Sequence, residues 1–201
     1  MKTTQLLGLV VLCLMGVLLA VSITACGSIG RSVTPEQAAR SQAAFEVVAS
    51  VLRHPRCMNC HTNTDFVRVS DDRIPHRMNV VRGPKNKGVP GMSCGTCHQS
   101  ENQEVAGVPG APHWSAAPLS MGWEGLDDHD LAKALLDRRK NGNRSHADLL
   151  KHMRQDPLVL WGWAPGSGRT TPPVDHAAFV REFEAWIENG AVLPEPGQTT
   201  Y

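Results

Sequence analysis

The chain has 201 residues, with 20 Lys and Arg, 19 Asp and Glu, and a formal net charge of +1. This near balance argues against nucleic acid as a partner, because nucleic-acid-binding chains usually carry a basic surplus. Aromatic residues make up only 5% of the chain, while glycine and proline number 18 and 14. A core built from side chains alone would therefore be thin for this length.

The chain begins with a pattern typical of export. Lys2 precedes an apolar run over residues 6–21, which is short for a membrane span and includes Cys13. Residues 23–27 resemble a bacterial lipobox, which predicts cleavage before Cys26 and a lipid on its thiol. We therefore predict a lipoprotein-type signal peptide over residues 1–25, a tether over residues 26–33 and one domain over residues 34–201. An ordinary signal peptide and an uncleaved anchor helix are the alternatives.

This interpretation places the protein outside the cytoplasm. The lipid on Cys26 would hold it to a membrane on the periplasmic side, and Gly27 favours the outer membrane because it is unlike an inner-membrane retention signal.

The elements predicted after the tether are helices. Thr34, Pro35 and Gln37 indicate a helix start, and His54-Pro55 indicates its end. Three further helices are predicted: one over residues 127–140, one from Ser145 to Pro157, and one from Asp175 to Gly190. Long Gly/Pro/Trp-rich loops join them, and no strand pattern stands out. The expected class is a mainly α fold.

Two short motifs give the chain its chemistry. Residues 57–61 and 94–98 each read C-x-x-C-H, with the residues Cys57, Cys60, His61, Cys94, Cys97 and His98. This is the attachment pattern of c-type haem: two thiols one helical turn apart bind the porphyrin, and the adjacent imidazole binds the iron. A four-cysteine zinc module or a redox-active dithiol is the alternative. The motifs predict two covalently bound haem c groups in a small di-haem cytochrome c domain, with helices and loops packed around them.

The second axial ligand decides what each iron does, because a second His or a Met makes an electron-transfer centre and an open position admits a small ligand. His61 and His98 are the predicted proximal ligands. We predict His76 and His113 as distal ligands because prolines fix the backbone beside them, with Met121 and His152 as runners-up. Arg82, in a basic loop, is a candidate partner for a haem propionate.

Four segments carry a resemblance to a known family: residues 54–61, 75–83, 109–114 and 156–163. Together they resemble exported bacterial di-haem cytochromes c that are often labelled as the cytochrome subunit of isoquinoline 1-oxidoreductase. The resemblance spans about residues 40 to 193. It implies an association with a molybdenum hydroxylase.

These patterns favour an electron carrier over an enzyme. A dehydrogenase would donate electrons, a cytochrome or oxidase would accept them, and the lipid would keep the carrier at the membrane. A di-haem peroxidase-like enzyme with one open iron site is the alternative, with Glu101, Glu104 or Glu124 as nominal acid–base groups. A haem-based sensor is less favoured, because the sequence predicts no second domain that would carry an output.

Overall fold

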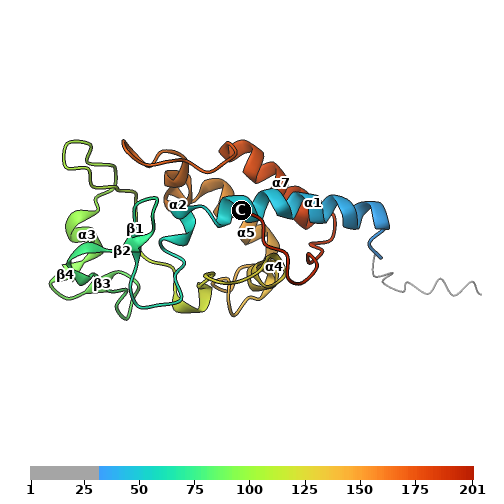
Figure 1. The fold of residues 1–201 in the computed structure, drawn as a ribbon, viewed down its shortest axis with the longest axis horizontal. Coiled ribbons are helices and arrows are strands. Elements are labelled where there is room, and N and C mark those ends of the chain that lie inside the picture. Colours follow the sequence, from blue (N-terminus) through green and yellow to red (C-terminus); the bar gives the residue numbers. More distant parts are fainter. Residues whose placement is uncertain (1–31) are drawn as a thin grey trace, which may run out of the picture. The chain divides into compact units, whose positions relative to one another are not determined.

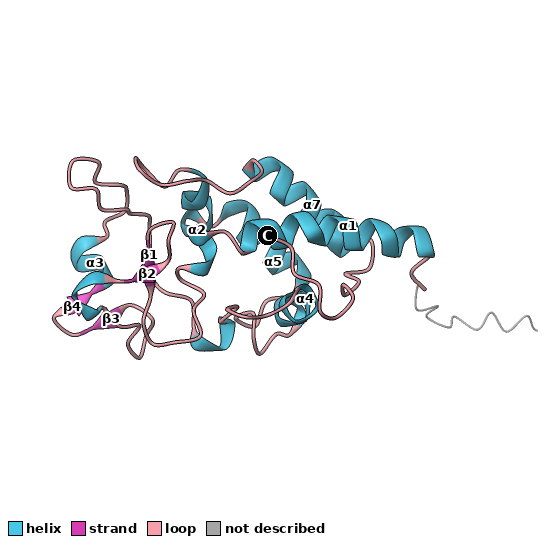
Figure 2. Ribbon diagram, viewed as in Figure 1, coloured by secondary structure: helices cyan, strands magenta, loops and turns pink. Residues whose placement is uncertain are grey.

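The structure is a computed structural model that describes residues 32–201 (Figure 1). The predicted signal peptide, the lipidation site Cys26 and nearly all of the tether lie outside the described residues. Residues 33–201 form one unit and are mainly α-helical, as the sequence predicts (Figure 2). Within residues 32–201, no helix is both long enough and apolar enough to cross a bilayer.

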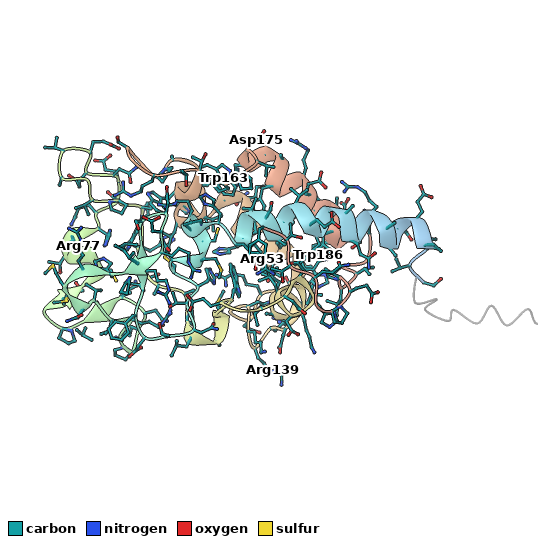
Figure 3. The ribbon with its side chains drawn as sticks, viewed as in Figure 1. Arg53, Arg77, Arg139, Trp163, Asp175 and Trp186 are labelled. Carbon is teal, nitrogen blue, oxygen red and sulfur yellow. The ribbon has the colours of Figure 1, made fainter. Side chains whose placement is uncertain are left out.

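The first and last helices form the centre of the fold. Helix α1 runs over Pro35–Leu52 and helix α7 over His176–Glu188. They pack side by side, with Trp186 directed toward α1 (Figures 1 and 3). The Phe45 and Trp186 rings lie 4.8 Å apart between centroids, and both side chains are fully buried. The Ser41 hydroxyl donates to the Trp186 carbonyl at 3.0 Å, so a buried polar group is also paired across this contact.

Helix starts follow the capping chemistry in the sequence. Thr34 and Gln37 form a capping box before α1, and Ser145 and Asp148 form another before α5 (His146–Gln155). Asp127 caps α4 (Asp128–Leu136), and its predicted extension to residue 140 is wrong. The helix ends at Leu136, because Asp137 is extended and residues 138–142 turn. Asp156 ends α5 and at once caps α6 (Pro157–Leu160), which the sequence did not predict.

A buried ion pair joins the end of α1 to the start of α4. Arg53 Nη2 lies 2.6 Å from Asp128 Oδ1, and Asp128 Oδ2 accepts from the Thr200 amide and hydroxyl at 3.0 and 2.7 Å. Arg53 also donates to the Leu126 carbonyl at 2.9 Å. These bonds connect α1, α4 and the C-terminal segment, and they satisfy charges that would be costly to leave unpaired below the surface.

The two motifs lie in different surroundings. The first begins in the short helix α2 (Pro55–Met58), directly after α1, and the second begins in α3 (Cys94–Cys97). Between them, β1 (Arg68–Val69) pairs with β2 (Ile74–Pro75), and β3 (Gly88–Val89) pairs with β4 (Met92–Ser93). The sequence did not predict these antiparallel hairpins, because two-residue strands are too short to show alternation. Figure 1 places α3 beside β3 and β4, away from α1 and α7.

Three single-turn 3₁₀ segments complete the loops: η1 (Arg77–Asn79), η2 (Leu119–Met121) and η3 (Trp161–Trp163). The loops that contain η2 and η3 are rich in Pro, Gly and Trp, and they bring residues far apart in sequence to the first motif.

The contact between α1 and α7 gives a stability prediction. Replacing Phe45 with Ala removes a fully buried ring from Trp186, so we expect the free energy of unfolding to fall by about 3–5 kcal/mol. Phe66→Ala is the matched control, because Phe66 is 47% exposed and its loss should change the value by less than about 1 kcal/mol. Denaturant titration measures both, and equal losses would contradict this core.

Candidate cofactor-binding sites

Each C-x-x-C-H motif forms one helical turn. The His61 amide donates to the Cys57 carbonyl at 3.2 Å, and the His98 amide donates to the Cys94 carbonyl at 2.9 Å. The two thiols and the imidazole of a motif are therefore held on the same turn, as their spacing predicts. The four cysteines of the two motifs carry free thiols.

Both imidazoles are oriented by a backbone carbonyl. His61 Nδ1 lies 2.8 Å from the Met121 carbonyl oxygen, and His98 Nδ1 lies 2.7 Å from that of Pro109. A carbonyl oxygen only accepts, so Nδ1 carries the proton in each ring. Burial lowers the pKa of His61 to about 3 and also lowers the pKa of His98. The rings are therefore neutral near pH 7, and each leaves the Nε2 lone pair available to a metal.

A tryptophan lies flat on each imidazole. The His61 and Trp123 ring centroids are 3.4 Å apart with an interplanar angle of 11°, and those of His98 and Trp114 are 4.5 Å apart at 6°. Trp123 is 4% exposed, and its amide donates to the His61 carbonyl at 3.0 Å. The stacked ring blocks one face of the imidazole and limits its rotation.

A glycine follows each residue whose carbonyl accepts from a motif histidine, and it allows close approach of the chain. A Cβ on Gly122 would lie 3.0 Å from the Thr62 carbonyl oxygen, and a Cβ on Gly110 would lie 2.2 Å from that of Glu101. Both contacts are to the chain just after a motif histidine. We call Met121, Gly122 and Trp123 the first cradle, and Pro109, Gly110 and Trp114 the second cradle. The two motifs are thus supported in the same way by two stretches of the loop between α3 and α4.

The first motif opens into a cavity of about 400 Å³ inside the helical part of the fold. Cys57, Cys60 and His61 form part of its wall, and most of the remaining lining is apolar, including Leu52, Leu135, Leu149, Val159, Trp163 and Phe179. The cations Arg56, Lys140 and Arg144 also line it. An apolar space with a few charged groups at its wall suits a flat, largely apolar ligand with carboxylate substituents.

One carboxylate holds two further histidines at this cavity. His152 Nδ1 lies 3.1 Å from Asp156 Oδ2, and His113 Nε2 lies 3.1 Å from Asp156 Oδ1. Burial lowers the pKa of His152. Burial raises the pKa of Asp156, but hydrogen bonds from His113 and the Leu158 amide outweigh it and lower the pKa overall. The bond to Asp156 leaves His152 Nε2 free, whereas His113 retains only Nδ1.

His76 lies beside the second motif. Its ring centroid is 6.1 Å from that of His98, with the planes at 76°. Its Nδ1 lies 2.8 Å from the Arg77 carbonyl oxygen, which leaves Nε2 free. A metal bound between two imidazoles places their centroids about 6 Å apart, because each metal–nitrogen bond is about 2 Å and each ring centre lies about 1 Å behind its nitrogen.

The second motif borders a hollow of about 350 Å³, and this hollow shares a wall with the first cavity. His113 and Trp114 line both spaces. The Trp114 ring also meets Trp161 edge to face, with centroids 4.8 Å apart, and Trp161 lines the first cavity. The two sites are therefore adjacent, and aromatic side chains lie between them.

Arg82 is a buried cation with unmet hydrogen-bonding capacity. It is 2% exposed, and Nη2 donates to the Thr62 hydroxyl at 2.8 Å and to the Thr62 and Thr64 carbonyls at 3.1 Å. Nε and Nη1 have no partner among residues 32–201. Burial lowers its pKa, and Cys60 is close enough to affect that pKa. Two unpaired donors on a buried guanidinium beside the first motif fit a carboxylate supplied by a bound group.

The alternatives for the cysteines find no support in this geometry. In the part of the chain that the structure describes, no three His, Cys, Asp or Glu side chains gather as a metal ion requires, so the two pairs do not form a four-cysteine zinc set. Burial raises the pKa of Cys57 to about 12 and that of Cys60 to about 11. A redox-active dithiol needs a lowered pKa, and the first pair has the opposite.

The predicted site residues are distributed over both sites. His76 lies at the second motif, and His113, Met121 and His152 line the first cavity. The Met121 carbonyl accepts from His61. The Met121 sulfur lies near Gly142, at 3.7 Å from where a Cβ on that glycine would be. The sequence reasoning missed Asp156 and the glycine and tryptophan of each cradle. The signal that was present is a glycine shortly before a tryptophan, which occurs twice in the loop after the second motif, at residues 110–114 and 122–123.

Comparison with protein families, with curated proteins and with solved structures gives no match to this chain.

The cradle glycines give a direct prediction. In Gly110→Ala, the new methyl group meets backbone oxygens of Glu101 and Gln99 within 2.6 Å, so the chain must move away from His98. We expect a loss of about 2–3 kcal/mol in the free energy of unfolding. Gly95→Ala is the control: nothing lies within 4 Å of its Cβ, and alanine favours a helical turn. Unfolding titrations in which Gly110→Ala is as stable as Gly95→Ala would disprove the close packing of the second cradle.

Proposed function

We propose that this protein is a c-type cytochrome with two covalently bound haems that carries electrons. The observation that carries the proposal is the repeated construction of the two sites. In each, a C-x-x-C-H turn presents two free thiols and an imidazole whose Nδ1 donates to a cradle carbonyl and whose face is covered by a tryptophan. Structural cysteines need none of these supports, whereas a metal-binding histidine needs its ring orientation and tautomer fixed.

The residues at the first site fit a haem. Cys57 and Cys60 would hold it by thioether bonds, and His61 Nε2 would bind the iron. The apolar lining of the cavity suits the porphyrin, and Arg82 Nε and Nη1 are free to donate to a propionate. At the second site, Cys94, Cys97 and His98 take the same roles.

The geometry favours one distal ligand for each iron. His76 suits the second site, because its ring lies 6.1 Å from that of His98 and its Nε2 is free. His152 suits the first site better than His113, because Asp156 holds its Nδ1 and leaves Nε2 free. Met121 is less suited, since its own carbonyl supports the proximal His61. We therefore assign His61 with His152 and His98 with His76.

Two protein ligands for each iron favour electron transfer over catalysis. A haem supplies reversible one-electron oxidation and reduction of its iron. This chain would orient the ligands, surround the first haem with a mostly apolar cavity and place the second site beside it. The proposal also includes export and a lipid on Cys26. It further includes electron supply from a dehydrogenase such as a molybdenum hydroxylase. These parts of the proposal rest on residues 1–31 and on the resemblance.

A spectroscopic redox titration of the purified exported protein tests the function. We expect two one-electron transitions per chain, with both haems low-spin in the oxidised and reduced states. A high-spin haem that turns over peroxide would instead identify the peroxidase-like alternative. A protein without haem absorbance would refute both.

The distal assignment gives a second test. In His76→Ala, or separately in His152→Ala, we expect about half of the ferric haem to become high-spin, because one of two irons loses a ligand. His113→Ala serves as the control and should leave both haems low-spin. Electron paramagnetic resonance of the oxidised variants reports the spin states. A high-spin signal in His113→Ala, with none in His152→Ala, would reverse the assignment at the first site.

A further inference from the structure

The chain around the second motif has one sign of charge. Residues 73–100 contain five cations, Arg73, Arg77, Arg82, Lys85 and Lys87, and no Asp or Glu. The whole chain carries +1, so this segment departs strongly from the average. Of the five, Arg73 is paired with Glu124 and Arg82 is buried. Arg77, Lys85 and Lys87 remain.

These three cations are exposed, and none has a carboxylate within ion-pair distance among residues 32–201. We call them, together with Met78, the basic face. Lys87 lines the hollow beside the second motif, and its carbonyl accepts from the Cys94 amide at 2.9 Å. Arg77 follows His76, and Figure 3 shows it near α3 and the hairpins. The basic face thus borders the second site.

The two sites differ in access from solvent. At the first motif, Cys57 and Cys60 are half-buried and Trp123 is 4% exposed, and the cavity is lined both by buried core side chains such as Phe179 and by exposed Pro118 and Lys140. At the second motif, Cys97 is exposed, and the hollow is lined by exposed Ser93, Gly95 and Gln99. A partner protein can therefore approach the second site more closely than the first.

An exposed apolar side chain lies within the same charged surface. Met78 is 72% exposed and lies directly after Arg77. An apolar contact surrounded by exposed charges is the usual composition of a transient protein interface, in which the charges guide encounter and the apolar group provides contact. The nearest carboxylates along the chain are Asp71 and Asp72 before the segment and Glu101 after it, and Asp71 is paired with Arg56.

We propose that the basic face, Arg77, Met78, Lys85 and Lys87, is the docking surface for a redox protein with an acidic surface. This inference rests on the proposed electron-transfer function and deepens it. Electrons enter and leave the protein through the second site, and the first site exchanges electrons with partner proteins through the second. In each exchange the partner gives up one electron and this chain accepts it, or the reverse.

Small redox reagents of opposite charge test the proposal with the haem-loaded full chain. The reduced protein is mixed by stopped flow with hexacyanoferrate(III), an anion, and separately with a cationic cobalt(III) complex, over a range of ionic strength. We expect the oxidation rate with the anion to fall as salt rises. In Arg77→Glu/Lys85→Glu/Lys87→Glu, the rate at low salt should drop at least about tenfold with the anion and rise with the cation.

A control triple separates the local surface from net charge. Lys133→Glu/Lys151→Glu/Arg181→Glu removes two lysines and one arginine on α4, α5 and α7, and all three side chains are exposed. It changes the net charge by the same amount and should alter the rate with the anion less than about twofold. Equal effects in the two triples would overturn the docking surface while leaving the cytochrome intact.

Adsorption provides a second readout that does not depend on turnover. The wild-type protein should adsorb to a carboxylate-terminated gold electrode and exchange electrons there, and the Arg77/Lys85/Lys87 triple should do neither. If that triple still adsorbs to the electrode but no longer binds phosphatidylglycerol vesicles that the wild type binds, the face is a lipid site and the proposal is wrong. Absence of haem from the wild type would instead refute the proposed function itself.

Discussion

The two sites depend on one interaction, a hydrogen bond from an imidazole Nδ1 to a backbone carbonyl. At 2.8 Å for His61 and 2.7 Å for His98, it fixes both the tautomer and the direction of the ring. A histidine directly after a cysteine on a single helical turn would otherwise be free to rotate. The carbonyl must therefore come from elsewhere in the chain, and the long loop after the second motif supplies it to both histidines.

The glycines and tryptophans of the cradles follow from this requirement. A carbonyl reaches the imidazole only where its own chain lies against the segment after the motif, and a side chain at residue 110 or 122 would prevent that approach. The tryptophan then covers the ring face that the loop leaves open. At the first site the surrounding helices add an apolar cavity, whereas the second site remains near solvent. This difference in burial is the reason to expect a sheltered and an accessible redox centre in one chain.

Local signals in the sequence predicted the helices well. The caps at Thr34, Ser145 and Asp175 marked real starts, and the C-x-x-C-H spacing produced a helical turn in both places. The hairpins were missed because two-residue strands show no periodicity. Helix α4 ends before its predicted limit, because Asp137 leaves the helical conformation and Asn141 bonds to the Leu135 carbonyl at 2.7 Å.

The supports of the sites could not be predicted, because they depend on contacts between distant segments. The sequence predicted the Met121 sulfur as a candidate iron ligand. In the structure, the Met121 backbone carbonyl contacts His61. Asp156 was noted only as the first residue of the segment 156–163 that carries the family resemblance, yet it bonds both His113 and His152. Spacing along the chain does not report such pairings. The distal ligands His76 and His113 stay predictions, with His152 now the better placed of the two candidates at the first site.

The central claim is that each motif holds its own haem through two thioether bonds. Peptide mass spectrometry of the purified exported protein tests it most directly. The account predicts that the peptides containing Cys57 with Cys60, and Cys94 with Cys97, each carry the added mass of one haem, with two irons per chain. Four unmodified cysteines, or zinc in place of iron, would contradict it.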